Sequence, residues 1–212
     1  MIHYRLVYMK KKDVPMRNTL ARYHLVCGEF PNTEIEIGLL SEFEPNVEVK
    51  ERLVLAVHAL RRDVTDYVIV SGGMTRPGSP SEAKLYGDWI FRTYPEIDHN
   101  RILLEDAALS TGAHIANLLP FLRDMGLPEP RKVVVLGRRS QIWKLRAYAW
   151  NIWSEETFLE EFVGCSDTKP WWWRLLDRTV FTLFAFADPH ERVLGLAISV
   201  RLWGYKATLG KK

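Results

Sequence analysis

Short runs of Val, Ile and Leu alternate along the chain with segments whose apolar residues recur every three or four positions. The runs are typical of strands buried on both faces of a parallel sheet, and the segments are typical of amphipathic helices. The strands predicted in this way are residues 35–40, 67–70, 102–104 and 133–136, with a less regular fifth run at 158–163. Because strands and helices alternate, we expect an α/β protein built on an open three-layer α/β/α sheet of about five mostly parallel strands.

Residues that favour helix ends predict where the helices begin. Asn46 is expected to cap the first helix, and Ser79-Pro80-Ser81-Glu82 has the order of an N-cap, a first-turn proline and a capping-box glutamate. Thr111 is expected to cap a third helix. Asp188-Pro189-His190-Glu191 repeats the pattern of cap, proline and glutamate, so a C-terminal helix is expected to follow it.

No internal repeat and no linker rich in Gly, Ser or Pro divides the 212 residues. We expect a basic N-terminal segment, residues 1–33, packed on the core; a sheet domain, residues 34–165; and a Trp-rich helical C-terminal extension of the same domain, residues 166–212. This length allows one sizeable core, since domains usually have ~100–200 residues.

The charge and the cysteine content indicate which partners and which cellular location to expect. Lys and Arg number 29 and Asp and Glu number 26, a surplus too small to indicate a nucleic-acid partner. Cys27 and Cys165 belong to no CxxC motif or Cys/His cluster, so a reducing, cytoplasmic location is expected and a metal site is not. No apolar run reaches the ~20 residues of a transmembrane segment, and the first residues lack the pattern of a signal peptide.

Candidate chemistry follows three predicted strands, because the carboxyl ends of parallel strands share one edge of a sheet. Ser71, Gly72 and Gly73 follow the strand at 67–70, and two adjacent glycines let backbone N–H groups approach an anion. Ser81 stands at the start of the next helix, whose N-terminus adds partial positive charge. We expect these residues to bind a ligand; the alternative is a tight turn without one.

The other two strand ends carry charged and hydroxyl side chains. Those expected to contribute to the same ligand site are Glu105, Asp106, Ser110, Thr111, Arg138, Arg139 and Lys144. Together they suit a polar, phosphorylated or otherwise anionic small molecule. The alternatives are the solvated end of a strand for the acidic residues and a solubilising surface for the basic ones.

Glu82 and Glu105 are the candidate catalytic residues. A glutamate becomes a general base near neutral pH when it is buried or lies beside another carboxylate, and these two would form such a pair if their strand ends adjoin. The alternative for Glu82 is that it only closes a capping box. The chain has no P-loop, dinucleotide-binding, zinc-protease or nucleophile-elbow motif that would indicate a different mechanism.

Four motifs follow one another: Val68-Ile-Val-Ser-Gly-Gly73; Ser81-Glu82-Ala83; Arg101-Ile-Leu-Leu-Glu-Asp106 with Thr111 after it; and Lys132-Val-Val-Val-Leu136. In this order and spacing they resemble the YdcF/SanA/ElyC family, over about residues 34–150. Ile37-Gly38-Leu39-Leu40 looks like the family's first βα unit, which adds Gly38 to the expected ligand-binding residues. The resemblance implies a Rossmann-like fold. It also implies a nucleotide-like ligand such as S-adenosylmethionine for soluble relatives, and a role in cell-wall or envelope polysaccharide metabolism for others.

Two departures from the family pattern bear on the chemistry. Ala113 and His114 stand where the family has Glu-Asn after the third strand. The family's Thr-Ser-x-Tyr-His stretch after the fourth strand is replaced by Gly137-Arg138-Arg139-Ser140-Gln141, with Lys144 as a stand-in for the Arg that follows. The chain has therefore either lost the family's chemistry or rebuilt its pocket around the two arginines for a more anionic ligand.

Three kinds of function remain open at this point. The first is a small-molecule enzyme of unassigned reaction, acting on an anionic or nucleotide-like ligand. The second is a ligand-binding or regulatory module without catalysis, or a factor in envelope polysaccharide metabolism. The third is a contact with a membrane surface or a nucleic acid through Lys10–Lys12 and the segment Pro170-Trp-Trp-Trp-Arg174. The alternative is that Trp171, Trp172 and Trp173 cover a face of their own domain or of a partner subunit.

Overall fold

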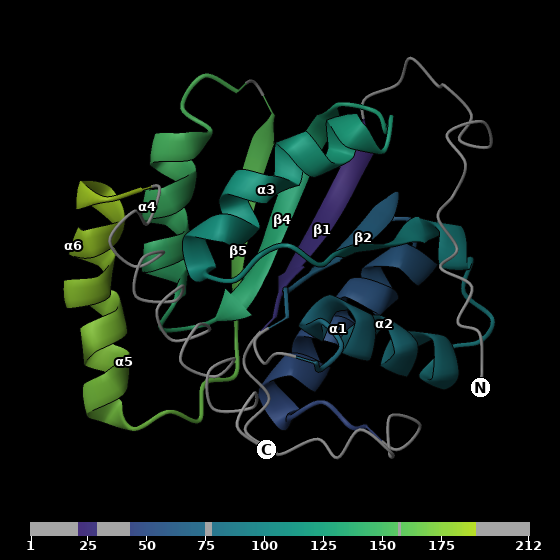
Figure 1. Ribbon diagram of the computed structural model, residues 1–212, viewed down its shortest axis with the longest axis horizontal. Helices are drawn as coiled ribbons and strands as arrows, with labels where there is room; N and C mark the ends of the chain where they lie inside the picture. Colours follow the sequence, from purple (N-terminus) through teal and green to yellow (C-terminus); the bar gives the residue numbers. More distant parts are fainter. Residues whose placement is uncertain (1–20, 29–42, 75–77, 157, 190–212) are drawn as a thin grey trace.

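Five parallel strands form a single sheet in the order β3-β2-β1-β4-β5 (Figure 1). The structure is a computed structural model that describes residues 21–28, 43–74, 78–156 and 158–189. The strands are β1 (Ala21–Cys27), β2 (Tyr67–Ser71), β3 (Ile102–Glu105), β4 (Pro130–Arg138) and β5 (Leu159–Cys165). The strands predicted from residue 67 onward are confirmed, and all the pairings between these five strands are parallel.

β1 is the central strand, and the sequence pattern does not predict it. Its sequence, ARYHLVC, places Arg22 and His24 between apolar residues and so lacks an uninterrupted apolar run. Arg22 is accommodated at the amino end of the sheet by Asp66, with Nη2 3.0 Å from Oδ1 and Nε 3.2 Å from Oδ2. The sheet domain therefore begins before residue 34. The predicted strand at 35–40 lies outside the described residues.

Helices α1 (Val47–Arg61), α2 (Glu82–Thr93), α3 (Thr111–Asp124) and α4 (Ile142–Ile152) alternate with the strands, and a short 3-10 helix, η2 (His99–Arg101), precedes β3. Asn46 caps α1 as predicted. The other two predicted caps are wrong: Ser81, not Ser79, caps α2, and Ser110, not Thr111, caps α3. In each helix the cap is the serine whose hydroxyl reaches the backbone N–H three residues further on.

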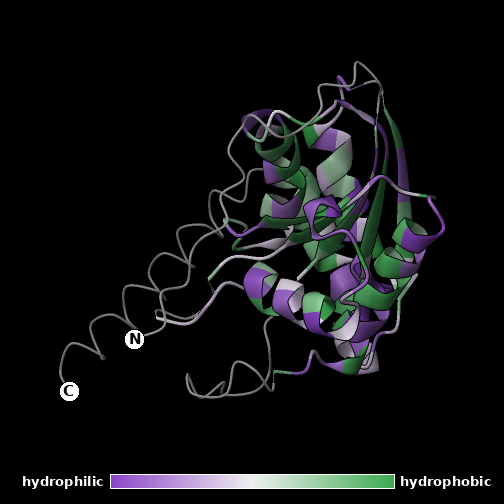
Figure 2. Cartoon of the chain, turned by 90° about the vertical axis from the view of Figure 1, so that its right-hand side faces the viewer, coloured by the Kyte–Doolittle hydropathy of each residue, from purple (hydrophilic) through white to green (hydrophobic). Residues whose placement is uncertain are grey.

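Two apolar cores lie on opposite faces of the sheet, as expected for three layers. Helices α3 and α4 cover one face, with Ile115 and Leu145 in the core, and α1 and α2 cover the other, with Leu53 and Trp89. Figure 2 shows that the strands between these helices are largely apolar. Because both faces are covered, most strands have few polar residues.

After β5 the chain forms α5 (Trp171–Arg178) and α6 (Val180–Ala187), which pack along α4 on the outer side of the molecule (Figure 1). The part of the extension that the structure describes is therefore helical, as predicted. Asp188 is the C-cap of α6, and the helix predicted to begin after it lies outside the described residues. Within the part of the chain that the structure describes, no helix is long and apolar enough to cross a membrane.

The fold is Rossmann-like, and its strand order reverses beside β1. β2 and β3 lie on one side of β1, and the connection after β3 passes to β4 on the other side. In an open sheet of this kind, ligands bind beyond the carboxyl ends of the strands at such a switch point. The residues there are Cys27 and Gly28 at the end of β1 and Arg138 at the end of β4. These strand ends, and the helix starts beside them, form the candidate site.

Candidate functional site

Ser71, at the carboxyl end of β2, joins side chains from two neighbouring elements. Its hydroxyl is hydrogen-bonded to Glu105 Oε2 at the end of β3 and lies 2.7 Å from His114 Nδ1 near the start of α3. Ser71 and Glu105 are partners in the register of β2 and β3, so both side chains leave the sheet on the face that α3 covers. All three are buried, with exposed fractions of 0% for Ser71, 3% for Glu105 and 7% for His114.

The second oxygen of Glu105 is also hydrogen-bonded. Oε1 accepts from the backbone N–H of Ala107 and from Asn117 Nδ2, each at 3.0 Å. Asn117 follows His114 by one turn of α3, so the helix presents both side chains to the same strand end. An ionised carboxylate only accepts hydrogen bonds, so this set of donors suits an ionised Glu105.

His114 is held in its neutral form. Burial lowers its pKa from 6.5 to about 3, and the positive charges of Arg52 and Lys144 act in the same direction. Because an ionised Glu105 takes the single hydroxyl proton of Ser71, the Ser71 oxygen accepts a hydrogen bond from His114, and Nδ1 carries the ring proton. Nε2 is then the unprotonated ring atom, and it makes no hydrogen bond to any residue that the structure describes.

Glu82 reaches over the ends of β1 and β2 from the first position of α2. A Cβ atom at Gly28 would collide with Glu82 Oε2, and one at Gly72 would lie 2.7 Å from Glu82 Cβ. Glycine at both positions therefore makes room for this carboxylate, which is 5% exposed. Because Glu82 is the first residue of α2 and not the third, it does not close a capping box, and that alternative is wrong.

The two glycines after β2 do not offer their N–H groups to a ligand. The N–H of Gly72 donates to the Glu105 carbonyl at 2.9 Å, and that of Gly73 donates to the Ala108 carbonyl at 2.6 Å. These bonds continue the pairing of β2 with the chain around the end of β3. The anion cradle predicted at Ser71-Gly72-Gly73 is therefore not formed by these groups. Gly73 instead allows a close approach, since a Cβ there would lie 2.8 Å from the Ala108 carbonyl oxygen.

A carboxylate from α5, Asp177, pairs with two of the three predicted basic side chains. Arg138 Nη2 lies 3.6 Å from Asp177 Oδ2, and Lys144 Nζ lies 3.3 Å from Asp177 Oδ1. Ser140 Oγ donates to the same carboxylate at 3.2 Å. Asp177 is 2% exposed and Arg138 is 4% exposed, so these charges are enclosed together. Arg139 alone of the three predicted cations is exposed.

Arg52 adds a further buried charge from α1. It is fully buried, its Nη1 donates to the Cys27 carbonyl at 2.7 Å, and its Nε donates to the Glu48 carbonyl at 3.1 Å. The Glu48 carboxylate accepts from the hydroxyl of Thr168 at 2.5 Å and from its backbone N–H. Arg52 thus places a positive charge at the end of β1, and Glu48 holds the chain after β5 against the same edge of the sheet.

The remaining predicted residues border the site or cap its helices. Ser81 and Ser110 are the caps of α2 and α3. Thr111 is half-buried in the first turn of α3, and Asp106 is exposed after β3. Gly38 lies outside the described residues.

One edge of the sheet brings most of these residues together. Cys27 pairs with Ser71, Ser71 pairs with Glu105, and β4 lies on the other side of β1. Since neighbouring strands are about 5 Å apart, the ends of β2 and β4 are separated by roughly 10 Å. Glu82 and Glu105 do not approach from the same side, because α2 and α3 cover opposite faces.

Sequence reasoning missed three residues of this site: Arg52, His114 and Asn117. Each interrupts an otherwise apolar helix face with a polar side chain. Arg52 lies directly before the buried Leu53, and His114 directly before the buried Ile115. They could have been identified as polar residues on the sheet-facing side of a helix, near its amino end.

No protein-family model matches the chain, and a search of curated proteins finds no match either. Among residues 21–28, 43–74, 78–156 and 158–189, no group of three or more His, Cys, Asp or Glu side chains is placed to hold a metal ion.

Proposed function

We propose that the chain is a small-molecule enzyme, similar to the YdcF family, that binds a nucleoside-type ligand such as S-adenosylmethionine at the carboxyl edge of its sheet. The observation that carries the proposal is the buried Glu105–Ser71–His114 hydrogen-bond chain at that edge, with the Glu82 carboxylate across the end of β2. Buried titratable groups with shifted pKa values gather at functional sites, because burial costs stability that a structural role alone rarely requires.

The charge balance of the edge supports a ligand with hydroxyl or positively charged groups. The buried or nearly buried charges of the described residues there are Glu48, Glu82, Glu105 and Asp177 against Arg52, Arg138 and Lys144. This balance disfavours a multiply charged phosphate. S-adenosylmethionine carries two ribose hydroxyls, a sulfonium and an ammonium group, all of which a carboxylate attracts. The exposed Arg139 is the candidate partner of its carboxylate.

The side chains divide into a candidate base and its supporting groups. Glu82 is the candidate general base, because its carboxylate can accept a proton at the switch point of the sheet. With a pKa of about 3, His114 is too weak a base at neutral pH, so we assign it the orientation of the ligand through Nε2. Glu105 and Ser71 are positioning residues that fix the tautomer of His114. Ser71 is not a nucleophile in this scheme, since it is fully buried.

Two measurements on the purified full chain test the ligand class. Native mass spectrometry shows whether a ligand co-purifies, and a thermal-shift screen compares adenosyl compounds, nucleotides and sugar phosphates. We expect an adenosyl compound at 100 times its Kd to stabilise the protein by about 2.7 kcal/mol. A preference for sugar phosphates would contradict the charge argument and favour the anionic ligand expected from the sequence.

The variant Glu82→Gln tests the site itself. It keeps the size of the side chain and removes its charge, so we expect ligand affinity to fall at least about tenfold, while the loss of the helix-dipole interaction costs about 1 kcal/mol of stability or less. The exposed Glu155→Gln is the matched control and should change neither quantity. Unchanged affinity in Glu82→Gln would remove Glu82 from the site. A ligand that binds and is always recovered unchanged would indicate a binding module without catalysis.

A further inference from the structure

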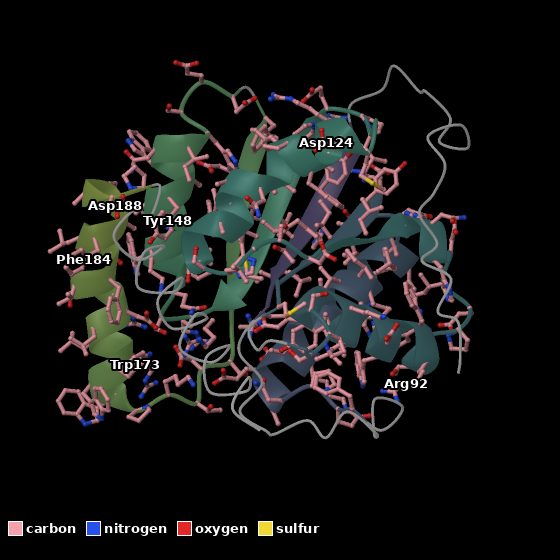
Figure 3. The ribbon with its side chains drawn as sticks, in the orientation of Figure 1. Arg92, Asp124, Tyr148, Trp173, Phe184 and Asp188 are labelled. Carbon is pink, nitrogen blue, oxygen red and sulfur yellow. The ribbon has the colours of Figure 1, made fainter. Side chains whose placement is uncertain are left out.

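The outer side of α5 and α6 exposes a group of large apolar side chains, called the outer apolar face below. Its members, with exposed fractions from 40% to 70%, are Trp171, Trp172, Leu175, Val180, Leu183, Phe184 and Phe186. Figure 3 labels Trp173 and Phe184 on these two helices, at the margin of the molecule. Contiguous exposed apolar surface of this kind marks an interaction site.

α6 explains why this face requires a partner. Its sequence, VFTLFAFA, is apolar at every position except Thr182, yet Ala185 is its single buried residue. A helix that is apolar all round is normally enclosed by protein or by lipid. α6 packs along α4 and α5, and among the residues that the structure describes its Leu183, Phe184 and Phe186 stay more than half exposed.

The exposed charges on α5 and α6 themselves have one sign, and the half-buried Asp188 follows at the end of α6. Arg174 and Arg178 are exposed on α5. The single carboxylate of α5, Asp177, is buried against Arg138 and Lys144 and is therefore screened from the surface. The described surface of these two helices thus combines tryptophan and phenylalanine with positive charge.

We propose that the outer apolar face binds to the interface of a membrane that contains anionic lipids. Tryptophan and phenylalanine on one side of short helices, bordered by arginine, are the side chains that enter the boundary between headgroups and acyl chains. The arginines would contact the lipid phosphates. The candidate site at the sheet edge would not attract these phosphates, because its carboxylates are negatively charged. This inference is independent of the proposed enzymatic function, because the face and the candidate site share no side chain.

A second copy of the chain fits this face less well. In a two-fold contact the same patch meets itself, so Arg174 and Arg178 would approach their own copies. Neither α5 nor α6 has an exposed carboxylate to pair with them. Lipid phosphates supply that negative charge.

Co-sedimentation of the full chain with vesicles tests the proposal. We expect binding to vesicles of phosphatidylcholine with about one-third phosphatidylglycerol, and weaker binding to phosphatidylcholine alone, since each basic residue near an anionic surface raises affinity about fivefold. Arg174→Gln with Arg178→Gln should remove this difference between the two vesicle types. Intrinsic tryptophan fluorescence should shift to shorter wavelength as the exposed indoles enter the interface.

Matched variants separate the outer apolar face from apolar surface elsewhere. Trp171→Ser with Phe184→Ser should reduce vesicle affinity at least about tenfold, because each removes a side chain that lipid would bury. The control is Leu55→Ser with Val64→Ser, which removes apolar side chains of 42% and 53% exposure from and beside α1, on the opposite face of the sheet. Circular dichroism checks that both double variants remain folded.

Four results would overturn the proposal. Failure of the unmodified chain to bind either kind of vesicle would do so directly, as would equal binding of the two serine variants. A dimer by light scattering that Trp171→Ser with Phe184→Ser converts to a monomer, without vesicle binding, would make the face a subunit contact. A lower melting temperature in that variant, with no vesicle binding and no dimer, would instead indicate that residues 190–212 of the same chain cover the face.

Discussion

The pKa of His114 depends on the burial of the hydrogen-bond network around Ser71. Its ring is enclosed between the strand end and α3, and Nδ1 is committed to the Ser71 hydroxyl. Protonation would place a positive charge in a largely buried position near Arg52 and Lys144 and would require a new arrangement of the hydrogen bonds. The native state therefore selects the neutral ring.

This preference predicts a dependence of stability on pH. The pKa of His114 is about 3 in the folded chain against 6.5 for an ordinary histidine, so between these values the unfolded chain binds a proton that the folded chain does not. The free energy of unfolding should therefore fall as the pH falls from 6.5 toward 3, by about 1.4 kcal/mol per pH unit for this residue. Urea unfolding at several pH values between 7 and 5 measures the slope.

The slope can be assigned with two variants. His114→Asn removes the titrating group, so its slope should be smaller than that of the unmodified chain by about 1.4 kcal/mol per pH unit. His58→Asn changes an exposed histidine of α1 and should leave the slope as it is. His24 of β1, whose pKa burial lowers to about 4, adds a similar contribution that both variants retain. An unaltered slope in His114→Asn would mean that the ring is solvated.

At the scale of elements, the start of α2 determines what Glu82 can do. With Ser81 as the cap, Glu82 occupies the first helical position and its carboxylate lies over the two strand ends. With Ser79 as the cap, the same carboxylate would have turned back to the helix backbone. The position of the helix start, two residues earlier or later, therefore decides whether Glu82 is a capping residue or a residue of the site.

Alanine substitution tests this assignment within one motif. Ser81→Ala should lower the free energy of unfolding by about 1 kcal/mol, because the backbone N–H of Lys84 loses its acceptor. Ser79→Ala is the matched control and should cost clearly less. A larger loss in Ser79→Ala than in Ser81→Ala, in urea unfolding at neutral pH, would restore the cap predicted from the sequence.

The elements also differ in how well the sequence predicts them. Strands β2, β3 and β4 were predictable because each is an unbroken apolar run, and their ends identified Ser71, Glu105 and Arg138. The partners of these residues were not predictable, because His114 and Asp177 belong to elements whose placement depends on packing. β1 was missed because polar residues interrupt its apolar run, and one of them, Arg22, is paired with the distant Asp66, which a local pattern does not reveal.

For the molecule as a whole, Asp177 links the C-terminal extension to the sheet. Its carboxylate contacts Arg138 of β4 and Lys144 of α4, and Asp177 and Arg138 are both buried. Asp177→Asn would remove the carboxylate that lies between the buried Arg138 and Lys144. We expect a loss of about 3–5 kcal/mol in the free energy of unfolding, measured by urea denaturation.

Asp124→Asn, at the exposed end of α3, is the control and should change stability by no more than about 0.5 kcal/mol. A small effect of Asp177→Asn, similar to that of the control, would show that α5 and α6 attach to the rest of the protein through apolar contacts alone.

The central position of β1 has a consequence for biosynthesis. β1 begins at Ala21, but one of its two neighbours, β4, begins at Pro130. During synthesis, β1 therefore leaves the ribosome long before β4 exists to pair with its second edge. This edge stays unpaired while about a hundred residues are translated, which takes roughly 5–20 s at the usual speed of synthesis. Nascent chains of this protein are thus expected to depend on chaperone protection during that interval.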